Sequence, residues 1–310
     1  MKKILVTGGA GFIGSNLVDA LVEKGYEVVV IDDLSLGKEE NLEQVKDKIK
    51  FYKRSICDDL SDIFKQGIDC VFHVAAVPRV QYSIQNPKET HNANVNGTVN
   101  LLLFCKNYGV KRFVFSSSSR VYGDQEKMPL KEDMETFPIS PYALHKLIGE
   151  HYCRIFNLLY GIETVSLRYF NVYGPKQDPE GGYALLIPKF AKMISEGKTP
   201  VINGTGEHTR DFTYVGDIVE ANILAAMTEN KECFGKVFNV GAGNNKSVNE
   251  VTDGILRLLE SNLKPEHGLD VVEPAHTLAD TSLIKWHLGW EPKVSFEEGL
   301  KRSIDDFKNN

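Results

Sequence analysis

The chain opens with the stretch that decides its fold, Lys2-Lys3-Ile4-Leu5-Val6-Thr7-Gly8-Gly9-Ala10-Gly11-Phe12-Ile13-Gly14. The short apolar run before Thr7 is typical of a buried strand. Glycines follow at a spacing of three, and apolar residues then recur at helical spacing. A strand, a glycine turn and a helix in this order let the backbone approach a pyrophosphate and direct a helix N-terminus at its charge. The stretch predicts a dinucleotide site formed by Gly8, Gly11, Phe12, Ile13 and Gly14.

The next predicted strand, residues 27–31, ends in Asp32. A carboxylate there can accept hydrogen bonds from the 2′- and 3′-hydroxyls of a ribose, and it would repel a 2′-phosphate. This arrangement favours NAD over NADP as the cofactor. The polar loop that follows can wrap the adenosine end, and we expect cofactor contacts from Asp33, Leu34, Ser35 and Gly37.

Composition limits the class of protein. The chain has 310 residues, of which 42% are hydrophobic and 25% charged, as in ordinary soluble proteins. The net charge of −6 argues against a nucleic-acid partner. We expect a cytoplasmic protein, because no apolar run approaches the ~20 residues of a membrane span and no signal-peptide pattern is present. We expect no metal site, because no metal-ligand spacing occurs among the cysteines, which are Cys57, Cys70, Cys105, Cys153 and Cys233.

Strands and helices alternate regularly up to about residue 172. The fourth predicted strand contains His73, expected to be a satisfied core histidine, and ends in Val74, Ala75 and Ala76, where small residues suit a ligand at the sheet edge. Further helices are predicted at 59–66 and 88–108 and from Tyr142 for about 18 residues. This alternation predicts an α/β fold with a doubly wound parallel (Rossmann) sheet.

Beyond residue 172 the alternation fades. A loop rich in Gly and Pro (174–184), helices at 185–196, 215–228, 248–261 and 295–307, and short strands predict a smaller C-terminal α/β substrate lobe. We assign residues 1–172, with part of 210–245, to the NAD-binding domain. Residues 173–310 mainly form the other lobe.

Tyr142 and Lys146 are four residues apart on a predicted helix, so both side chains lie on one face. An ammonium group there, with a bound nicotinamide cation, would lower the pKa of the tyrosine and make it a general base. The strand before this helix ends in four serines, residues 116–119, and a serine hydroxyl can relay a proton from a substrate hydroxyl to the tyrosine. Together these residues predict a site that removes or returns hydride at a carbinol carbon.

Several motifs in order resemble the extended short-chain dehydrogenase/reductase family, and within it the UDP-hexose 4-epimerases. They are the glycine turn, the serine run before Val121-Tyr122-Gly123, the Tyr142/Lys146 pair, Arg168-Tyr169-Phe170-Asn171, and Thr209-Arg210-Asp211-Phe212-Thr213-Tyr214-Val215. The resemblance covers nearly the whole chain. It implies 4-epimerisation of a UDP-hexose through a transient 4-keto sugar, with NAD remaining tightly bound.

The resemblance also implies roles for individual residues. Tyr142 is the catalytic acid and base, Lys146 lowers its pKa and holds the nicotinamide ribose, and Ser118 contacts the sugar's 4-oxygen. Asn171 would contact the nucleotide sugar and Arg210 the diphosphate. The remaining implied cofactor contacts are Ser55, Ile56, Val74, Ala75, Ala76, Asn94, Ser116, Tyr169 and Phe170, and the remaining substrate contacts are Leu185, Asn203 and Thr277.

Related activities remain as alternatives. Sugar-nucleotide 4,6-dehydratases place Thr-Asp-Glu, and decarboxylases a Glu, before Val-Tyr-Gly, whereas this chain has Ser118-Ser119-Arg120. Arg120 is either a solvent-facing turn residue or a cation near the sugar's C5 substituent, which would suit a UDP-uronate 4-epimerase. The intact catalytic set argues against a non-catalytic NAD-binding module.

Three further positions bear on ligand recognition. Thr277 is small where epimerases restricted to plain hexoses carry a tyrosine, so UDP-N-acetylglucosamine is a plausible substrate. Asp270 stands where an arginine usually grips the diphosphate, and Ser55 replaces an acid that usually contacts adenine. Finally, the resemblance suggests a homodimer joined by a four-helix bundle from the helices near 90–108 and 142–159.

Overall fold

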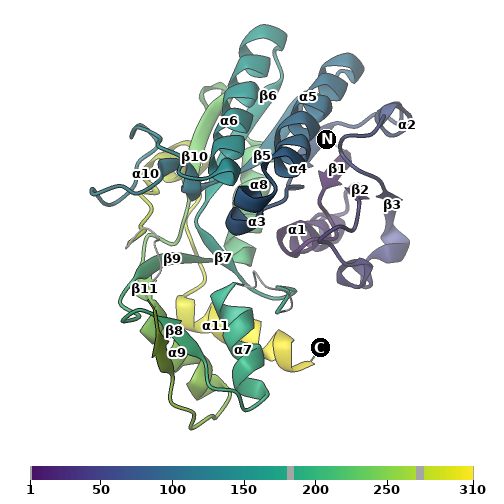
Figure 1. The fold of residues 1–310 in the computed structure, drawn as a ribbon. Helices are drawn as coiled ribbons and strands as arrows, with labels where there is room; N and C mark the ends of the chain where they lie inside the picture. The colour runs from purple at the N-terminus through teal and green to yellow at the C-terminus, as the bar shows by residue number, and fades with distance from the viewer. Residues whose placement is uncertain (1, 180–184, 270–275, 310) are drawn as a thin grey trace.

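The computed structural model describes residues 2–179, 185–269 and 276–309 and consists of a larger and a smaller part (Figure 1). The larger part is built on a seven-stranded sheet in the order β10-β6-β5-β4-β1-β2-β3, and all of its pairings are parallel. The doubly wound parallel sheet expected from the βα alternation is therefore confirmed. Its strands are β1 (Lys3–Thr7), β2 (Glu27–Asp32), β3 (Ile49–Lys53), β4 (Cys70–His73), β5 (Arg112–Ser118), β6 (Glu163–Tyr169) and β10 (Lys236–Val240).

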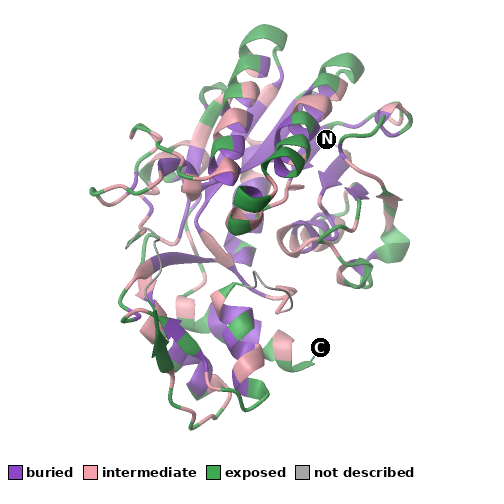
Figure 2. Ribbon diagram, viewed as in Figure 1, coloured by how far each residue is buried: buried purple, intermediate pink, exposed green. Residues whose placement is uncertain are grey.

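Helices cover both faces of this sheet, and the strands between them are buried (Figure 2). One face packs against α1 (Phe12–Glu23), α8 (Val215–Met227) and α10 (Ser282–Leu288), through a core that includes Leu17 and Ile218. The other packs against α2 (Ser61–Phe64), α5 (Gly97–Tyr108) and α6 (Pro141–Tyr160), with Leu101 and Phe156 in its core. Strands buried on both faces explain the continuous apolar runs in the sequence.

The helix expected over 88–108 is divided into three pieces. These are α4 (Pro87–His91), a π-helical turn (Asn92–Asn96) and α5. At the π turn, Asn94 Oδ1 accepts from the backbone N–H of Val77 at 2.7 Å and its Nδ2 donates to the Val77 carbonyl at 3.1 Å. The widened turn thus places Asn94 against the loop that follows β4.

The helix α6 is positioned at its first turn. Its N-cap, Ser140, accepts a hydrogen bond from the Ala143 N–H, and Pro141 occupies the first helical position. The Tyr142 N–H donates to Ser83 Oγ on α3 (Val80–Gln85) at 3.1 Å. Side-chain contacts therefore fix the end of the helix that presents Tyr142.

The smaller part contains a three-stranded sheet, a two-stranded sheet and three helices. Tyr173 and Phe212 pack edge to face in its core, with ring centroids 6.2 Å apart. The elements are β7 (Asn171–Tyr173), β9 (Thr209–Tyr214), β11 (Asn245–Ser247), β8 (Val201–Asn203), β12 (Glu266–Gly268), α7 (Leu186–Ser195), α9 (Val248–Leu258) and α11 (Phe296–Asn309). The short 3₁₀ turns are Glu39–Leu42, Lys46–Lys48, Ser119–Tyr122 and Lys231–Cys233.

Two expectations from composition can be compared with the structure. None of the helices in the described ranges is long and apolar enough to cross a membrane. Four of the five cysteines are buried, and Cys57 is exposed. His73 is a buried histidine with both ring nitrogens hydrogen-bonded, as expected. One ring nitrogen lies 2.9 Å from Thr7 Oγ1 and the other lies 2.8 Å from Thr98 Oγ1.

Candidate active site

A cavity of about 1640 Å³ lies between the carboxyl ends of the sheet strands and the smaller part of the molecule. Ligand pockets usually measure about 300–1,000 Å³, so this cavity has room for more than one drug-sized ligand. Gly8, Asp32 and Tyr142 of the larger part line it together with Arg210, which lies on the smaller three-stranded sheet. The cavity can therefore hold a dinucleotide and a second molecule.

The glycine turn fits closely against the neighbouring strand. Gly8 has φ +70, and a Cβ on it would lie 2.6 Å from the Ala75 backbone nitrogen. A Cβ on Gly14 would lie 2.0 Å from the Gly8 carbonyl oxygen. Because β1 lies between β2 and β4, this turn is where the strand order reverses, which is the usual ligand crevice of such sheets.

The first turn of α1 is suited to an anion. No side chain caps this helix at Gly11, so its first backbone N–H groups can donate to a phosphate. Asp32 lies at the adjacent strand end, where Oδ2 accepts from the Ala10 N–H and Oδ1 from the Leu34 N–H, both at 2.9 Å. Burial raises the pKa of Asp32, while these two bonds favour its charged form. Each carboxylate oxygen can still accept from a ribose hydroxyl, so the residues present fit NAD.

Tyr142, Ser118 and Lys146 all line the cavity, and each is less than a tenth exposed. Burial raises the pKa of Tyr142, while a hydrogen bond with Ser118 and the charge of Arg120 act in the opposite direction. Lys146 Nζ donates to the Ser116 carbonyl at 2.7 Å. Burial is thus the largest influence on the Tyr142 pKa in the protein alone, and the lowering expected beside Lys146 and a bound nicotinamide stays a prediction.

A hydrogen-bond chain supports the serine run. The Tyr169 hydroxyl lies 2.9 Å from Ser116 Oγ and donates to Asn222 Oδ1 at 2.8 Å. Burial raises the pKa of Tyr169 to about 12, so this phenol stays neutral at physiological pH. With its hydroxyl held by Ser116 and Asn222, Tyr169 supports the serine run from below.

A buried ion pair lies beneath the same serines. Arg168 Nε and Nη2 donate to the two carboxylate oxygens of Glu150, each at 2.8 Å. Ser117 Oγ donates to Glu150, and the Arg168 guanidinium lies 4.6 Å from the centre of the Tyr122 ring. Because Glu150 is one turn beyond Lys146 on α6, this pair fixes the catalytic helix against β5 and β6.

The substrate end of the cavity is shaped by β9 and the loops beside it. Arg210, Asn171, Leu185 and Asn203 all line the cavity. Next to Arg210, buried Asp211 accepts hydrogen bonds from the N–H groups of Ala242, Gly243 and Ala279. Asp211 thereby holds two loops beside the strand that carries Arg210.

Most of the predicted contact residues line the cavity, but three do not: Leu34, Asn94 and Thr277. Leu34 contributes its backbone N–H to Asp32, and the amide of Asn94 is bonded to Val77. Thr277 lies beside the strand of Arg210, where its N–H donates to the Thr209 carbonyl and its Oγ1 accepts from the Asp211 N–H. Asp270, expected near the diphosphate, lies outside the described residues.

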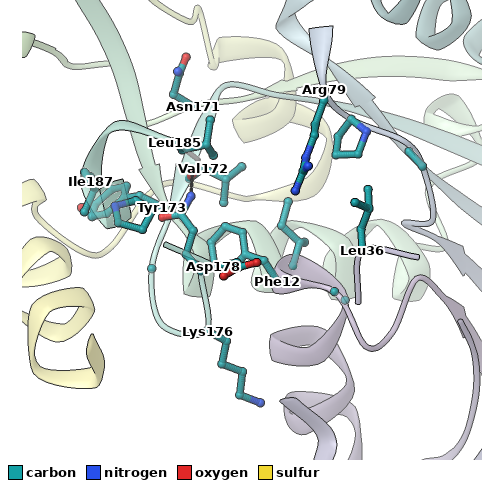
Figure 3. Close-up of a pocket in the computed structure, with 18 of the residues that line it drawn as sticks. Phe12, Leu36, Arg79, Asn171, Val172, Tyr173, Lys176, Asp178, Leu185 and Ile187 are labelled. Carbon is teal, nitrogen blue, oxygen red and sulfur yellow. Dashed lines mark hydrogen bonds between the residues drawn. The ribbon is translucent and has the colours of Figure 1, made fainter. Parts of the chain in front are cut away.

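Sequence reasoning missed several charged residues that line the cavity. Figure 3 shows Arg79 reaching into it toward Phe12, with Asn171 and Leu185 on the side of the smaller part. Arg79 follows Ala76 by three residues, so its place beyond a strand end was a usable signal. Lys38, Lys176 and Asp178 come together from distant segments and gave no such signal.

Arg120 also lines the cavity and is partly buried. Its charge acts to lower the pKa of the Tyr142 phenol. It is therefore not simply a solvent-facing turn residue. Within the described ranges, no group of three or more His, Cys, Asp or Glu side chains could hold a metal ion.

Comparison with known proteins agrees with this geometry. The NAD dependent epimerase/dehydratase family matches residues 4–241. A UDP-glucose 4-epimerase from Thermotoga maritima, solved with UDP-glucose, is 40% identical, with 99% of both chains covered and a TM-score of 0.94. A UDP-N-acetylglucosamine 4-epimerase from Methanobrevibacter ruminantium M1, in complex with UDP-N-acetylmuramic acid, is also 40% identical, covering 99% and 98% with a TM-score of 0.94.

A third solved structure is more distant. A UDP-glucuronic acid 4-epimerase from Bacillus cereus, in complex with UDP-glucuronic acid and NAD, is 34% identical, with 99% of both chains covered and a TM-score of 0.91. The family match and these full-length likenesses assign NAD as the cofactor and nucleotide-sugar modification as the general activity. The chain belongs to the NAD dependent epimerase/dehydratase family.

Proposed function

We propose that the protein is a 4-epimerase of a UDP-hexose, acting on UDP-glucose and UDP-galactose and on their N-acetyl counterparts. The observation that supports this most directly is that Ser118, Tyr142 and Lys146 line one cavity together with the glycine turn and Arg210. The likeness to two 4-epimerases at 40% identity supports the same reaction class.

In the proposed reaction, Tyr142 accepts the proton of the sugar's 4-hydroxyl, and Ser118 orients that hydroxyl toward it. NAD, when bound, supplies the acceptor for the C4 hydride and later its donor. Arg210 and Asn171 would keep the nucleotide in place while the 4-keto sugar presents its opposite face. Tyr142 then returns the proton, so the enzyme ends the cycle unchanged.

Dehydration fits the site less well. Elimination of water needs an acid and a base beside the reacting carbons. The turn after Ser118 offers Ser119 and Arg120 in place of a carboxylate pair, and both line the cavity. An epimerase needs no further acid, because the proton that Tyr142 removes is the one it returns.

The experiment that tests this function uses NMR to follow the conversion of the gluco to the galacto epimer, for the UDP-hexose and for its N-acetyl counterpart. Purified protein incubated with UDP-glucose or UDP-N-acetylglucosamine is expected to produce the galacto epimer of at least one, with unchanged mass. Tyr142→Phe is expected to slow turnover by about 10²–10⁴-fold, the usual contribution of a general acid–base group. Absence of any epimer from either sugar, with folded NAD-loaded protein, would refute the proposal.

Arg120 favours a second candidate, a UDP-uronate 4-epimerase. Arg120 lines the same cavity as Ser118 and Tyr142, and C5 is bonded to the C4 carbon at which these two residues would act, so its guanidinium is a candidate partner for a carboxylate on C5. Guanidinium groups bind carboxylates through paired, charge-assisted hydrogen bonds.

Arg120→Ala distinguishes the two candidates. If the substrate is a uronate, the ratio of kcat/KM for UDP-glucuronate to that for UDP-glucose should fall about tenfold or more, since a charged hydrogen bond contributes about 1.5–3 kcal/mol. Steady-state kinetics with both sugars give this ratio, and Ser119→Ala is the control in the same turn. If the ratio of the two kcat/KM values does not change, the proposal of a UDP-uronate 4-epimerase loses its support.

We also propose that the protein is a homodimer. Helices α5 and α6 lie side by side on the surface (Figure 1) and leave apolar side chains exposed, with Leu158 77% and Leu159 63% accessible. Two such pairs can form a four-helix bundle that removes this apolar surface from water.

Changing both Leu158 and Leu159 to Glu is expected to convert the dimer to a monomer, because the carboxylates would be buried without partners. Sedimentation equilibrium of wild type and variant measures the mass directly. Leu269→Glu, at an exposed leucine elsewhere, should remain dimeric. A monomeric wild type at micromolar concentration would contradict the proposal.

A further inference from the structure

We propose that residues 175–178 form a latch that retains NAD in the cavity, with Lys176 as the residue that holds it closed. The segment follows β7 in the smaller part of the molecule, and the Pro175 carbonyl and the Lys176 ammonium group reach residues of the NAD-binding part. The inference rests on NAD being the cofactor and does not depend on which sugar is used.

Lys176 joins three elements. Its backbone N–H donates to Asp306 Oδ2 on α11 at 2.9 Å. Its ammonium group donates to Asp19 Oδ2 on α1 at 2.5 Å and to the Asn41 carbonyl at 2.7 Å. In Figure 3 this side chain extends out of the segment and away from the other labelled cavity residues. One side chain thus ties the smaller part to the helix that begins at the glycine turn.

The backbone of Lys176 indicates that these contacts determine the conformation. Its φ of 66 lies in the left-handed region, which a lysine seldom adopts without compensating interactions. Its side chain is 17% exposed, so its charge is screened less than that of a surface lysine. Among the residues that the structure describes, Asp19 Oδ1 is buried without a hydrogen-bond partner, so Lys176, which bonds to Oδ2, is the cation that neutralises this carboxylate.

Two weaker contacts lie on either side of Lys176. Asn16 Nδ2 on α1 donates to the Pro175 carbonyl at 3.1 Å. Lys38 and Asp178 form an ion pair at 3.1 Å, but their side chains are 50% and 36% exposed. Exposed ion pairs of this kind contribute little free energy, so the contacts of Lys176 are the main ones that hold the segment. The other two contacts help to position it.

The latch lies next to the residues that hold the cofactor. Lys38 and Asn41 follow Asp32 in the chain, and both donate to the Ala10 carbonyl in the glycine turn, at 3.0 and 2.8 Å. Lys38, Asn41, Lys176 and Asp178 line the same cavity as Gly11 and Asp32. A cofactor held by the turn and by Asp32 would therefore lie in the cavity that Lys176 and Asp178 help to enclose, and the proposed latch requires residues 175–178 to move for its release on this side. Retention suits a reaction in which NAD is not consumed.

The test measures release of NAD. Lys176→Met removes both ammonium contacts and should raise the NAD dissociation rate about tenfold, the effect of losing one partly buried charged contact. Asp19→Asn should act in the same direction, and the double variant should add little, because both act through one interaction. Lys46→Met, which removes an exposed ion pair outside the cavity, is the matched control.

Full-length protein loaded with NAD is diluted into an NAD-consuming dehydrogenase assay, and the appearance of free NAD is followed with time. Circular dichroism and thermal unfolding of the NAD-free variants show whether they remain folded. Wild-type release rates in a folded Lys176→Met protein, or equal acceleration by Lys46→Met, would overturn the proposal. The readout contains no sugar, so its failure and the failure of the epimerase proposal are separate results.

Discussion

Replacing Lys146 with methionine is expected to stabilise the NAD-free protein while removing most of its activity. Burial lowers the pKa of Lys146 from 10.5 to about 8. Each pKa unit corresponds to about 1.4 kcal/mol, so holding this lysine charged costs the folded state about 3 kcal/mol at pH 7. Methionine fills a similar volume without charge, and we expect the free energy of unfolding to rise by about 1–3 kcal/mol.

The effect has a defined pH dependence. Below pH 8 the lysine is charged in both the folded and the unfolded state, so the cost is constant. Between about pH 8 and 10.5 the unfolded chain keeps the proton that the folded protein has lost, so the stability of the wild type rises with pH. The advantage of Lys146→Met should therefore shrink across this window.

Urea unfolding of both NAD-free proteins at several pH values from 7 to about 10.5 measures this difference. Turnover by the NAD-loaded variant should fall by about 10²-fold or more, because Tyr142 loses the neighbouring cation that helps it to ionise. A variant that is less stable than wild type at pH 7, or a difference that does not change with pH, would contradict the burial argument.

Replacing Arg168 with methionine should have the opposite effect on stability. It leaves the Glu150 carboxylate, only 4% exposed, without its two guanidinium hydrogen bonds. Breaking a buried pair from one side costs about 3–5 kcal/mol, because the remaining charge is uncompensated. Since Glu150 lies on α6 and bonds to Ser117, the serine run should also be displaced and the activity should fall.

The double variant Arg168→Met/Glu150→Met separates charge from packing. It should recover most of the lost stability, because replacing both members of a buried pair is often nearly neutral. Unfolding in guanidinium chloride gives the free energy of unfolding of the wild type, both single variants and the double variant, and so completes a double-mutant cycle. If the double variant is as unstable as Arg168→Met, packing of the arginine against Tyr122 outweighs the buried charge.

The parts of this protein that could be predicted from the sequence depend on local patterns. The glycine spacing after β1, the acid at Asp32 and the Tyr142/Lys146 spacing each lie within one strand–turn–helix unit, where neighbours in sequence are neighbours in space. The βα alternation predicted the parallel sheet for the same reason. The expected helix over 88–108 was only approximate, because the contact of Asn94 with Val77 introduces a π turn.

The parts that could not be predicted depend on distant segments meeting. The partner of Arg168 is one residue among many acids until the packing of α6 on β6 is known. Lys176 binds Asp19 across 157 positions in the sequence. The pKa of Tyr142 depends on how completely the cavity buries it, which spacing does not reveal.

The most direct test of the central claim follows a deuterium atom at C4 of the UDP-hexose. In the proposed reaction Tyr142 transfers only the hydroxyl proton, and the C4 hydrogen passes to NAD as hydride and comes back. The galacto epimer formed in ordinary water should therefore keep the deuterium at C4, and its mass should be unchanged. NMR and mass spectrometry of the product show both. Loss of the label to solvent, or a product lighter by water or carbon dioxide, would contradict 4-epimerisation by this site.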